Sequence, residues 1–224
     1  VEFARAMRDV GWMVITGAGD GIMKAGHGGA GREASFGVAI RLPFEQRTND
    51  VIEKDKKLIN FNYFFTRKLM FVKESEAIAV FPGGFGTQDE LFEALTLVQT
   101  GKAPLMPIVL VEHRGGQYWQ EWLDYVRGHL LAAGLISPED LDLFYLTNEA
   151  PLAVEEVVRF YRVHHSNRYV GPDLVLRLHR RLSPAFLAML NEKYGPHLLA
   201  RGAIEQTAPL PGEEHEYPDK PRLK

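Results

Sequence analysis

The stretch "AIAVFPGGFGTQDELFEAL", residues 77–95, has the clearest structural pattern in the chain. A short apolar run leads into a proline and closely spaced glycines, and apolar residues at helical spacing follow. A strand, a glycine loop and a helix in this order make one unit of an α/β fold. The stretch therefore predicts a buried strand that ends in a glycine loop, with a helix starting soon after it.

The same alternation continues on both sides of this unit. Strands are expected over 12–16, 36–42, 77–83, 107–112 and 143–148, and helices over 1–10, 22–34, 61–76, 88–100, 117–134 and 151–165. Each expected strand is a short continuous apolar run, which indicates burial on both faces. The sequence thus predicts an α/β fold with a parallel sheet covered by helices on both faces, and a long surface loop at 43–60.

The chain changes character after about residue 168. Residues 1–168 are expected to form the α/β domain, and residues 169–224 a C-terminal extension of one or two helices with a proline-rich, charged tail that reads more as linker than as core. Because Val1 stands in the middle of an amphipathic helical pattern, we also expect that the natural N-terminus, with a first strand, precedes it.

Composition narrows the class of protein. The net charge of −3 gives no argument for nucleic-acid binding, and the absence of cysteine excludes disulfides and thiolate metal sites. No apolar run approaches the roughly 20 residues that cross a bilayer. The pairs His164–His165 and Asp140–Asp142 lack the spacing of metal ligands. We therefore expect a cytoplasmic protein that binds no metal and no nucleic acid and does not associate with a membrane.

Two glycine loops stand between a strand and a helix. Their glycines are Gly17, Gly19 and Gly21 in the first loop, and Gly83, Gly84 and Gly86 in the second. Backbone N–H groups at a helix N-terminus bind phosphate, and ligands of open α/β sheets lie at the carboxyl ends of strands. The alternative is that the glycines only permit tight turns. Neither loop continues as a P-loop or completes a dinucleotide fingerprint. The second loop, entered through Pro82, is the stronger candidate for a phosphate site.

Thr87 and Glu90 in the second loop have two interpretations. Thr-x-x-Glu before an apolar helix is the signature of a capping box, in which the two side chains bond backbone N–H groups. The other interpretation is that Glu90 is an acid of an active site. Arg67 and Lys68 stand next to each other on the preceding expected helix, either as solvated side chains or as a phosphate-binding pair.

At these residues the chain resembles the LONELY GUY family, the cytokinin riboside 5′-monophosphate phosphoribohydrolases that are often mislabelled as lysine decarboxylases. The family pattern P-G-G-x-G-T-x-x-E is matched in full by residues 82–90, and the upstream Arg-Lys pair by Arg67 and Lys68. The segments "RLPFEQ" and "YFFTRKLMFVKE" are similar to the larger bacterial members. The resemblance, which runs from about residue 10 to 165, implies a Rossmann-like fold and a homodimer or higher homo-oligomer.

The resemblance also implies an activity, which is hydrolysis of the N-glycosidic bond of a nucleoside 5′-monophosphate to free base and ribose 5-phosphate. The substrate would be a cytokinin riboside monophosphate, AMP or another nucleoside monophosphate. Arg67 and Glu90 are carried over as catalytic, and the expected nucleotide contacts are Lys68, Gly83, Gly84, Phe85, Gly86, Thr87 and Thr96, with Gly17, Gly19 and Gly21 of the first loop. We expect Arg67 to orient Glu90 and to keep its carboxylate ionised.

Other functions stay open. The family's first loop usually reads Gly-Gly-Gly, where this chain has Gly17–Ala18–Gly19. No lysine stands in a recognisable pyridoxal-phosphate context, so lysine decarboxylation and a bound cofactor are not expected. The alternative to the hydrolase is a non-catalytic protein that binds or carries a nucleotide or a phosphorylated cofactor, as the related molybdenum-cofactor carriers do. A third interpretation gives the C-terminal extension a regulatory role, in which it senses a ligand or fixes the oligomeric state.

Overall fold

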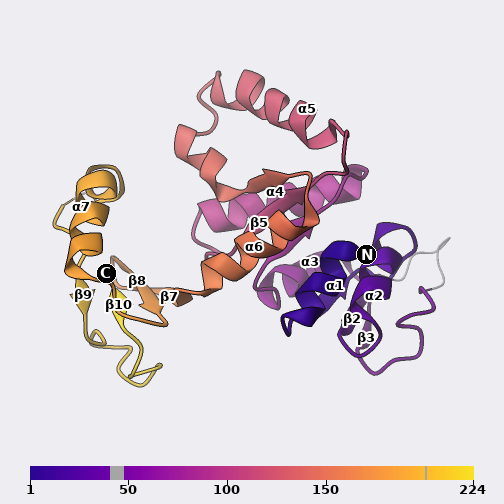
Figure 1. Ribbon diagram of the computed structural model, residues 1–224, viewed down its shortest axis with the longest axis horizontal. Coiled ribbons are helices and arrows are strands. Elements are labelled where there is room, and N and C mark those ends of the chain that lie inside the picture. The colour runs from indigo at the N-terminus through magenta and orange to yellow at the C-terminus, as the bar shows by residue number, and fades with distance from the viewer. Residues whose placement is uncertain (41–47, 200) are drawn as a thin grey trace. The chain divides into compact units, whose positions relative to one another are not determined.

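The computed structural model describes residues 1–40, 48–199 and 201–224 (Figure 1). The chain divides into two compact units, Val1–Val157 and Val158–Lys224. The division lies inside a helix, whereas the sequence predicted it after residue 168. Each unit has its own sheet or sheets.

The N-terminal unit alternates strands and helices in the way that the sequence predicts. Its strands are β1 Val14–Thr16, β2 Ser35–Ile40, β3 Leu58–Phe61, β4 Ile78–Val80, β5 Ile108–Val111 and β6 Tyr145–Thr147. Its helices are α1 Glu2–Asp9, α2 Ile22–Ala30, α3 Phe64–Lys73, α4 Phe85–Gln99, α5 Tyr118–Tyr125, continued by a π-helical segment Val126–Leu131, a 3₁₀ segment Pro138–Leu143, and most of α6 Ala150–Tyr161. The strands pair in parallel as β1-β2-β3 and β4-β5-β6. The fold is α/β and Rossmann-like.

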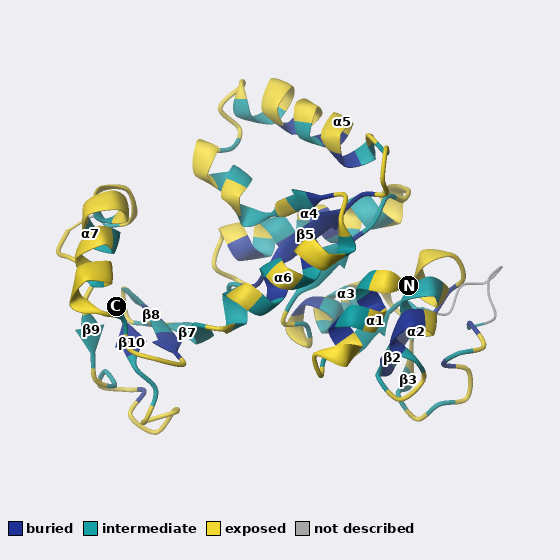
Figure 2. Ribbon diagram, viewed as in Figure 1, coloured by how far each residue is buried: buried dark blue, intermediate teal, exposed yellow. Residues whose placement is uncertain are grey.

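Strand β5 is apolar along its whole length, which explains why helices cover both of its faces. All four of its residues are buried, as the dark blue ribbon in Figure 2 shows. Ile108 and Leu110 pack with residues of α4 and α5, while Val109 and Val111 pack with residues of α1 and α6. Successive side chains of a strand point to opposite faces, so an unbroken apolar run needs cover on both. The prediction from continuous apolar runs is therefore confirmed at this strand.

The prediction of a long surface loop at 43–60 is correct only in part, because residues 48–57 form turns without a helix or strand but the end of the segment is a strand. Leu58–Phe61 forms β3 and pairs with β2, and Asn49 and Ile52 are buried. The charged run "EKDKK" before Leu58 hides the strand, whose four residues are too few to show a period. Residues 43–47, like residues 41 and 42 of the strand expected at 36–42, lie outside the described residues.

The C-terminal unit contains the expected helix, α7 Pro184–Leu198, and also a sheet that the sequence does not predict. Four antiparallel strands run in the order β7-β8-β10-β9. They are β7 His164–Val170, β8 Asp173–Leu178, β9 Gln206–Thr207 and β10 Arg222–Leu223. Helix α7 has no buried residue and is largely exposed in Figure 2. The helix expected at 151–165 ends at Tyr161, because His164 and His165 belong to β7.

A buried ion network fastens the tail to this sheet. The Glu213 side chain is fully buried between Arg177 of β8 and Arg222 of β10, and both guanidinium groups donate to its carboxylate. Burial works to raise the pKa of Glu213, but the hydrogen bonds from the two arginines outweigh it and lower the pKa. The tail is therefore part of the packed unit, and the prediction that it is more linker than core is wrong.

Candidate active site

The two glycine loops follow β1 and β4, at the carboxyl ends of the two parallel sheets. The strand orders are β1-β2-β3 and β4-β5-β6. Strands β1 and β4 are therefore each the first strand at one edge of their sheet, and the later strands are added on the other side. Ligands of open α/β sheets bind outside the carboxyl ends of strands, at the point where the winding changes direction. The loops after β1 and β4 are the ones that this rule selects.

Arg67 of α3 lies between the first glycine loop and α4, the helix that follows the second loop. A side chain built on Gly17 would come within 3.6 Å of Arg67 Nη1, so the guanidinium group lies beside the first loop. Its other terminal nitrogen, Nη2, donates to Glu90 Oε1 of α4 over 3.1 Å. The Arg67 Cζ atom also lies 5.2 Å from the ring centre of Phe64 and 5.6 Å from that of Phe71. The structure thus brings together Gly17, Arg67 and Glu90, as the sequence predicts.

The capping box predicted for Thr87 and Glu90 is absent. Helix α4 begins at Phe85 with Gly84 as its N-cap, and no side chain caps it. Thr87 is therefore the third residue of the helix, and Glu90 lies in its second turn. Gly84 is extended, with φ −85° and ψ −157°, and the residues of the glycine loop that follow it form the first turn of the helix. Glu90 turns to Arg67 instead of to its own helix.

Burial dominates the acidity of Glu90. Its side chain is 31% exposed, and its burial raises the pKa of Glu90 above the usual value. The positive charges of Arg67 and Lys68 lower this pKa but only partly offset the effect of burial. The nearby carboxylate of Glu93 also raises it. Arg67 thus favours the ionised form, as expected, but burial outweighs it. A carboxyl group with a raised pKa is better suited to taking up and giving back a proton than an ordinary carboxylate.

Lys68 has partners of its own on α4. Its ammonium group binds Asp89 Oδ2 at 2.8 Å and Glu93 Oε2 at 2.9 Å. Burial disfavours the charged form of Lys68, but the hydrogen bonds that Lys68 donates to Asp89 and Glu93 outweigh burial and raise the pKa of Lys68. These bonds join α3 to α4 and fix the helix that carries Glu90. A contact between Lys68 and phosphate stays a prediction from the family resemblance.

The second glycine loop presents backbone N–H groups at the start of α4. The amides of Thr87 and Gln88 bond to the carbonyl oxygen of Gly84, whereas those of Gly84–Gly86 precede the hydrogen-bonded part of the helix. The described first turn holds no acidic side chain, and Phe85 is 96% exposed. A Cβ on Gly83 would overlap Thr87 Oγ1, which explains the glycine at this position. The arrangement fits a bound anion.

A buried polar network, which the sequence does not reveal, shapes the first glycine loop. His27 is fully buried and lies 3.0 Å from Thr16 Oγ1 through Nε2 and 3.2–3.3 Å from the Asn49 side chain through Nδ1. Asn49 in turn donates to the carbonyl oxygen of Gly19, and Ala18 adopts φ 61°. Loop 17–21 is therefore held by its own protein contacts. The partners of His27 lie 11 and 22 positions from it in sequence, and Asn49 and Gly19 lie 30 positions apart, so no local motif marks the network.

Thr96 lies away from the loops. Its hydroxyl donates to the carbonyl oxygen of Phe92, and it stands six residues beyond Glu90 on α4, about 9 Å along the helix axis. The structure does not bring it to the site formed by Arg67 and Glu90.

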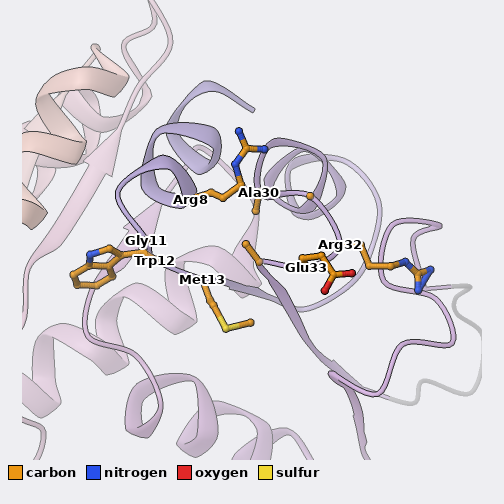
Figure 3. Close-up of a pocket in the computed structure, with 9 residues that line it drawn as sticks. Arg8, Gly11, Trp12, Met13, Ala30, Arg32 and Glu33 are labelled. Carbon is orange, nitrogen blue, oxygen red and sulfur yellow. The ribbon is translucent and has the colours of Figure 1, made fainter.

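A hollow of about 500 Å³ lies at the opposite edge of β1 and β2 (Figure 3). Its lining comes from Gly11–Met13 before β1 and Ala30–Ala34 before β2, with Arg8. In Figure 3 the side chains of Arg8, Trp12 and Arg32 point in different directions. Arg8 binds Asp9, and Arg32 binds Asp55 and the carbonyl oxygen of Glu53. Because its two arginines are paired with other groups and do not converge, we place the candidate site at the carboxyl edge.

Residues 19–157, more than half of the chain, match the family described as "Possible lysine decarboxylase". The chain belongs to this LONELY GUY-like family. Among curated proteins, no relative matches the chain. In the part of the chain that the structure describes, no helix is long and apolar enough to cross a membrane, and no group of three or more histidine or acidic side chains is placed to hold a metal ion.

Two solved structures that are similar to this LONELY GUY-like chain are molybdenum-cofactor proteins. The molybdenum cofactor binding protein of Rippkaea orientalis is 17% identical, with a TM-score of 0.50 over 71% of this chain and 83% of that one. The molybdenum cofactor carrier protein of Chlamydomonas reinhardtii is 18% identical, with a TM-score of 0.48 over 70% and 83%. At these identities the likeness to the Rippkaea protein concerns the fold alone.

Proposed function

We propose that the protein hydrolyses the N-glycosidic bond of a nucleoside 5′-monophosphate to free base and ribose 5-phosphate. The observation that carries this proposal is the Arg67–Glu90 pair, 3.1 Å apart, beside two glycine loops at the carboxyl edge of a parallel fold. Family membership fits a nucleotide-like ligand. A cytokinin riboside monophosphate or an AMP-like nucleotide is the proposed substrate, and the cytoplasm the proposed compartment.

In this proposal the N–H groups of Gly84–Gly86 bind the 5′-phosphate, which anchors the ribose with C1′ near Glu90. The bond from C1′ to the base nitrogen breaks through a cationic sugar, and the base leaves with the bonding electrons. Water adds to C1′, and Glu90 takes the proton of that water and returns it to the departing base. Arg67 holds the Glu90 carboxylate in place through its hydrogen bond.

A binding protein without catalysis is the alternative. Molybdenum-cofactor proteins share the fold, and a carrier also needs an anion-binding loop. A carrier has no use for a half-buried acid whose pKa is raised, however, and such a group costs stability. Glu90 therefore favours the enzyme.

We also propose a homodimer or higher homo-oligomer, because Phe65 and Leu69, one turn apart on α3, are 69% and 59% exposed.

The dependence on the 5′-phosphate tests the proposal. Binding energy from the phosphate positions the glycosidic bond, so we expect kcat/KM for AMP, GMP, CMP or UMP, whichever is best, to exceed that of its nucleoside by about 10²-fold or more. Chromatography of the released base measures both rates. Equal rates for the nucleoside and its monophosphate would show that the glycine loop does not bind the phosphate.

The pH profile tests the role of Glu90. A base must be ionised, so activity is expected to rise with pH through a pKa above the ordinary carboxyl value of 4.5. Glu93→Gln removes a negative charge that raises the pKa of Glu90, so it should move the acidic limb of kcat/KM to lower pH. Lys68→Met removes a positive charge and should move this limb to higher pH. Identical limbs in all three proteins would mean that another group titrates.

A further inference from the structure

Tyr118, the first residue of α5, forms a hydrogen bond with the second glycine loop. Its hydroxyl donates to the carbonyl oxygen of Gly83 over 2.5 Å and accepts a hydrogen bond from Gln88 Nε2 over 2.7 Å. Gly83 stands before α4 and Gln88 stands within it, so a single hydroxyl bridges the two sides of the loop. We propose that Tyr118 is a positioning residue, which holds the Gly83–Gly84 peptide in the orientation that binds the 5′-phosphate. This inference rests on the proposed function.

The planarity of the peptide bond explains how Tyr118 acts on the site. In a trans peptide the C=O and the following N–H point in opposite directions. A Gly83 carbonyl that points to Tyr118 therefore makes the Gly84 N–H point away from Tyr118. Without this hydrogen bond the peptide between two glycines can rotate, because neither residue has a Cβ that restricts it. A rotated peptide would present its carbonyl oxygen to the phosphate and repel it.

The protein core fixes Tyr118 without help from a ligand. The amide of Trp119, the next residue, donates to Glu112 Oε2 over 3.1 Å, and Trp119 is fully buried. The Tyr118 ring meets the Trp119 ring edge to face, with centres 4.8 Å apart. Burial works to raise the pKa of Glu112, but hydrogen bonds from the amides of His113 and Trp119 outweigh it and lower the pKa. A buried carboxylate thus anchors the helix end that presents the Tyr118 hydroxyl.

The variant Tyr118→Phe tests this inference, because it removes the hydroxyl and keeps the ring on Trp119. Tyr125→Phe, at the other end of the same helix, removes a hydroxyl from a half-exposed tyrosine and is the matched control. We expect kcat/KM for the best monophosphate to fall about tenfold in Tyr118→Phe, the effect of one hydrogen bond, and to stay unchanged in Tyr125→Phe. The rate for the corresponding nucleoside should be the same in both variants, since it has no phosphate to position.

Calorimetric titration of the full chain with inorganic phosphate separates this inference from the proposed reaction. The expected dissociation constant is about tenfold weaker for Tyr118→Phe than for Tyr125→Phe. Equal constants, or equal losses of rate for nucleoside and monophosphate, would overturn the role of Tyr118. If the wild type binds phosphate but cleaves no monophosphate, the hydrolase proposal fails and the titration still decides the role of Tyr118. If the wild type binds no phosphate, the role of Tyr118 fails, and release of base from the monophosphates alone decides the hydrolase proposal.

Discussion

Replacing Glu90 with glutamine is expected to lower kcat/KM for the best nucleoside 5′-monophosphate by about 10³-fold, within the range for loss of a general base. Glutamine has the size of glutamate and can still accept the hydrogen bond from Arg67, which spans 3.1 Å. It cannot take the proton of the attacking water. The measurement is the initial rate of base release by Glu90→Gln, at a pH where the wild-type rate no longer changes with pH.

Glu93→Gln is the matched control for this variant. Glu93 lies on the same helix, its side chain is 32% exposed against 31% for Glu90, and it also binds a cation, at 2.9 Å. At the plateau pH its activity should stay within about threefold of the wild type, as for most substitutions outside a site. If Glu93→Gln loses as much activity as Glu90→Gln, or Glu90→Gln loses none, Glu90 is not the base.

Stability separates a catalytic role for Glu90 from a structural one. Because its pKa is raised in the folded protein, the folded state binds this proton more tightly than the unfolded chain. The resulting stabilisation is present below the unfolded pKa and is lost as pH rises through the folded one. At neutral pH Glu90→Gln should therefore melt no lower than the wild type. A lower melting temperature would indicate that the ion pair with Arg67 mainly holds the fold.

The second large effect is expected at Glu213. The Glu213 side chain is 0% exposed and lies between the buried guanidinium groups of Arg177 and Arg222. In Glu213→Gln these two groups lose the negative charge between them. Removing one partner of a buried ion pair costs about 3–5 kcal/mol. For a unit of this size that is much of the free energy of unfolding. We expect hydrogen exchange at the amides of β8 and β10 to become much faster in the full chain.

Glu214→Gln serves as the control, because Glu214 is the next residue and is exposed. Its exchange pattern should match that of the wild type. Equal protection of β8 and β10 in the two variants would show that the tail does not depend on the Glu213 network.

The local patterns of the sequence predict the α/β unit well. Residues 77–95 form β4, the glycine loop and α4, because a continuous apolar run and a glycine cluster are both local signals. The start of α4 is different. Thr87 and Glu90 match a capping box in spacing, but Gly84 begins the helix three residues earlier, and tertiary contact with Arg67 decides where Glu90 points.

The sheet of the C-terminal unit has no comparable signal. Strand β7 reads "HHSNRYV", without an apolar alternation, and β8 places Arg177 at a buried position. Arg177 can be buried only because Glu213, 36 residues later, neutralises it. Asn49, the partner of His27, and Glu93, a partner of Lys68, are similarly remote in sequence from the residues that they bind. Pairings between distant polar residues depend on the fold, and a single sequence does not display them.

The most direct measurement is a ³¹P and ¹H NMR time course of the wild type with each of AMP, GMP, CMP and UMP, and with a cytokinin riboside 5′-monophosphate. The account predicts that at least one of them is converted to equal amounts of free base and ribose 5-phosphate, and that Glu90→Gln binds the same nucleotide without converting it. A wild-type protein that binds these nucleotides and leaves all of them intact would contradict the account and favour a carrier.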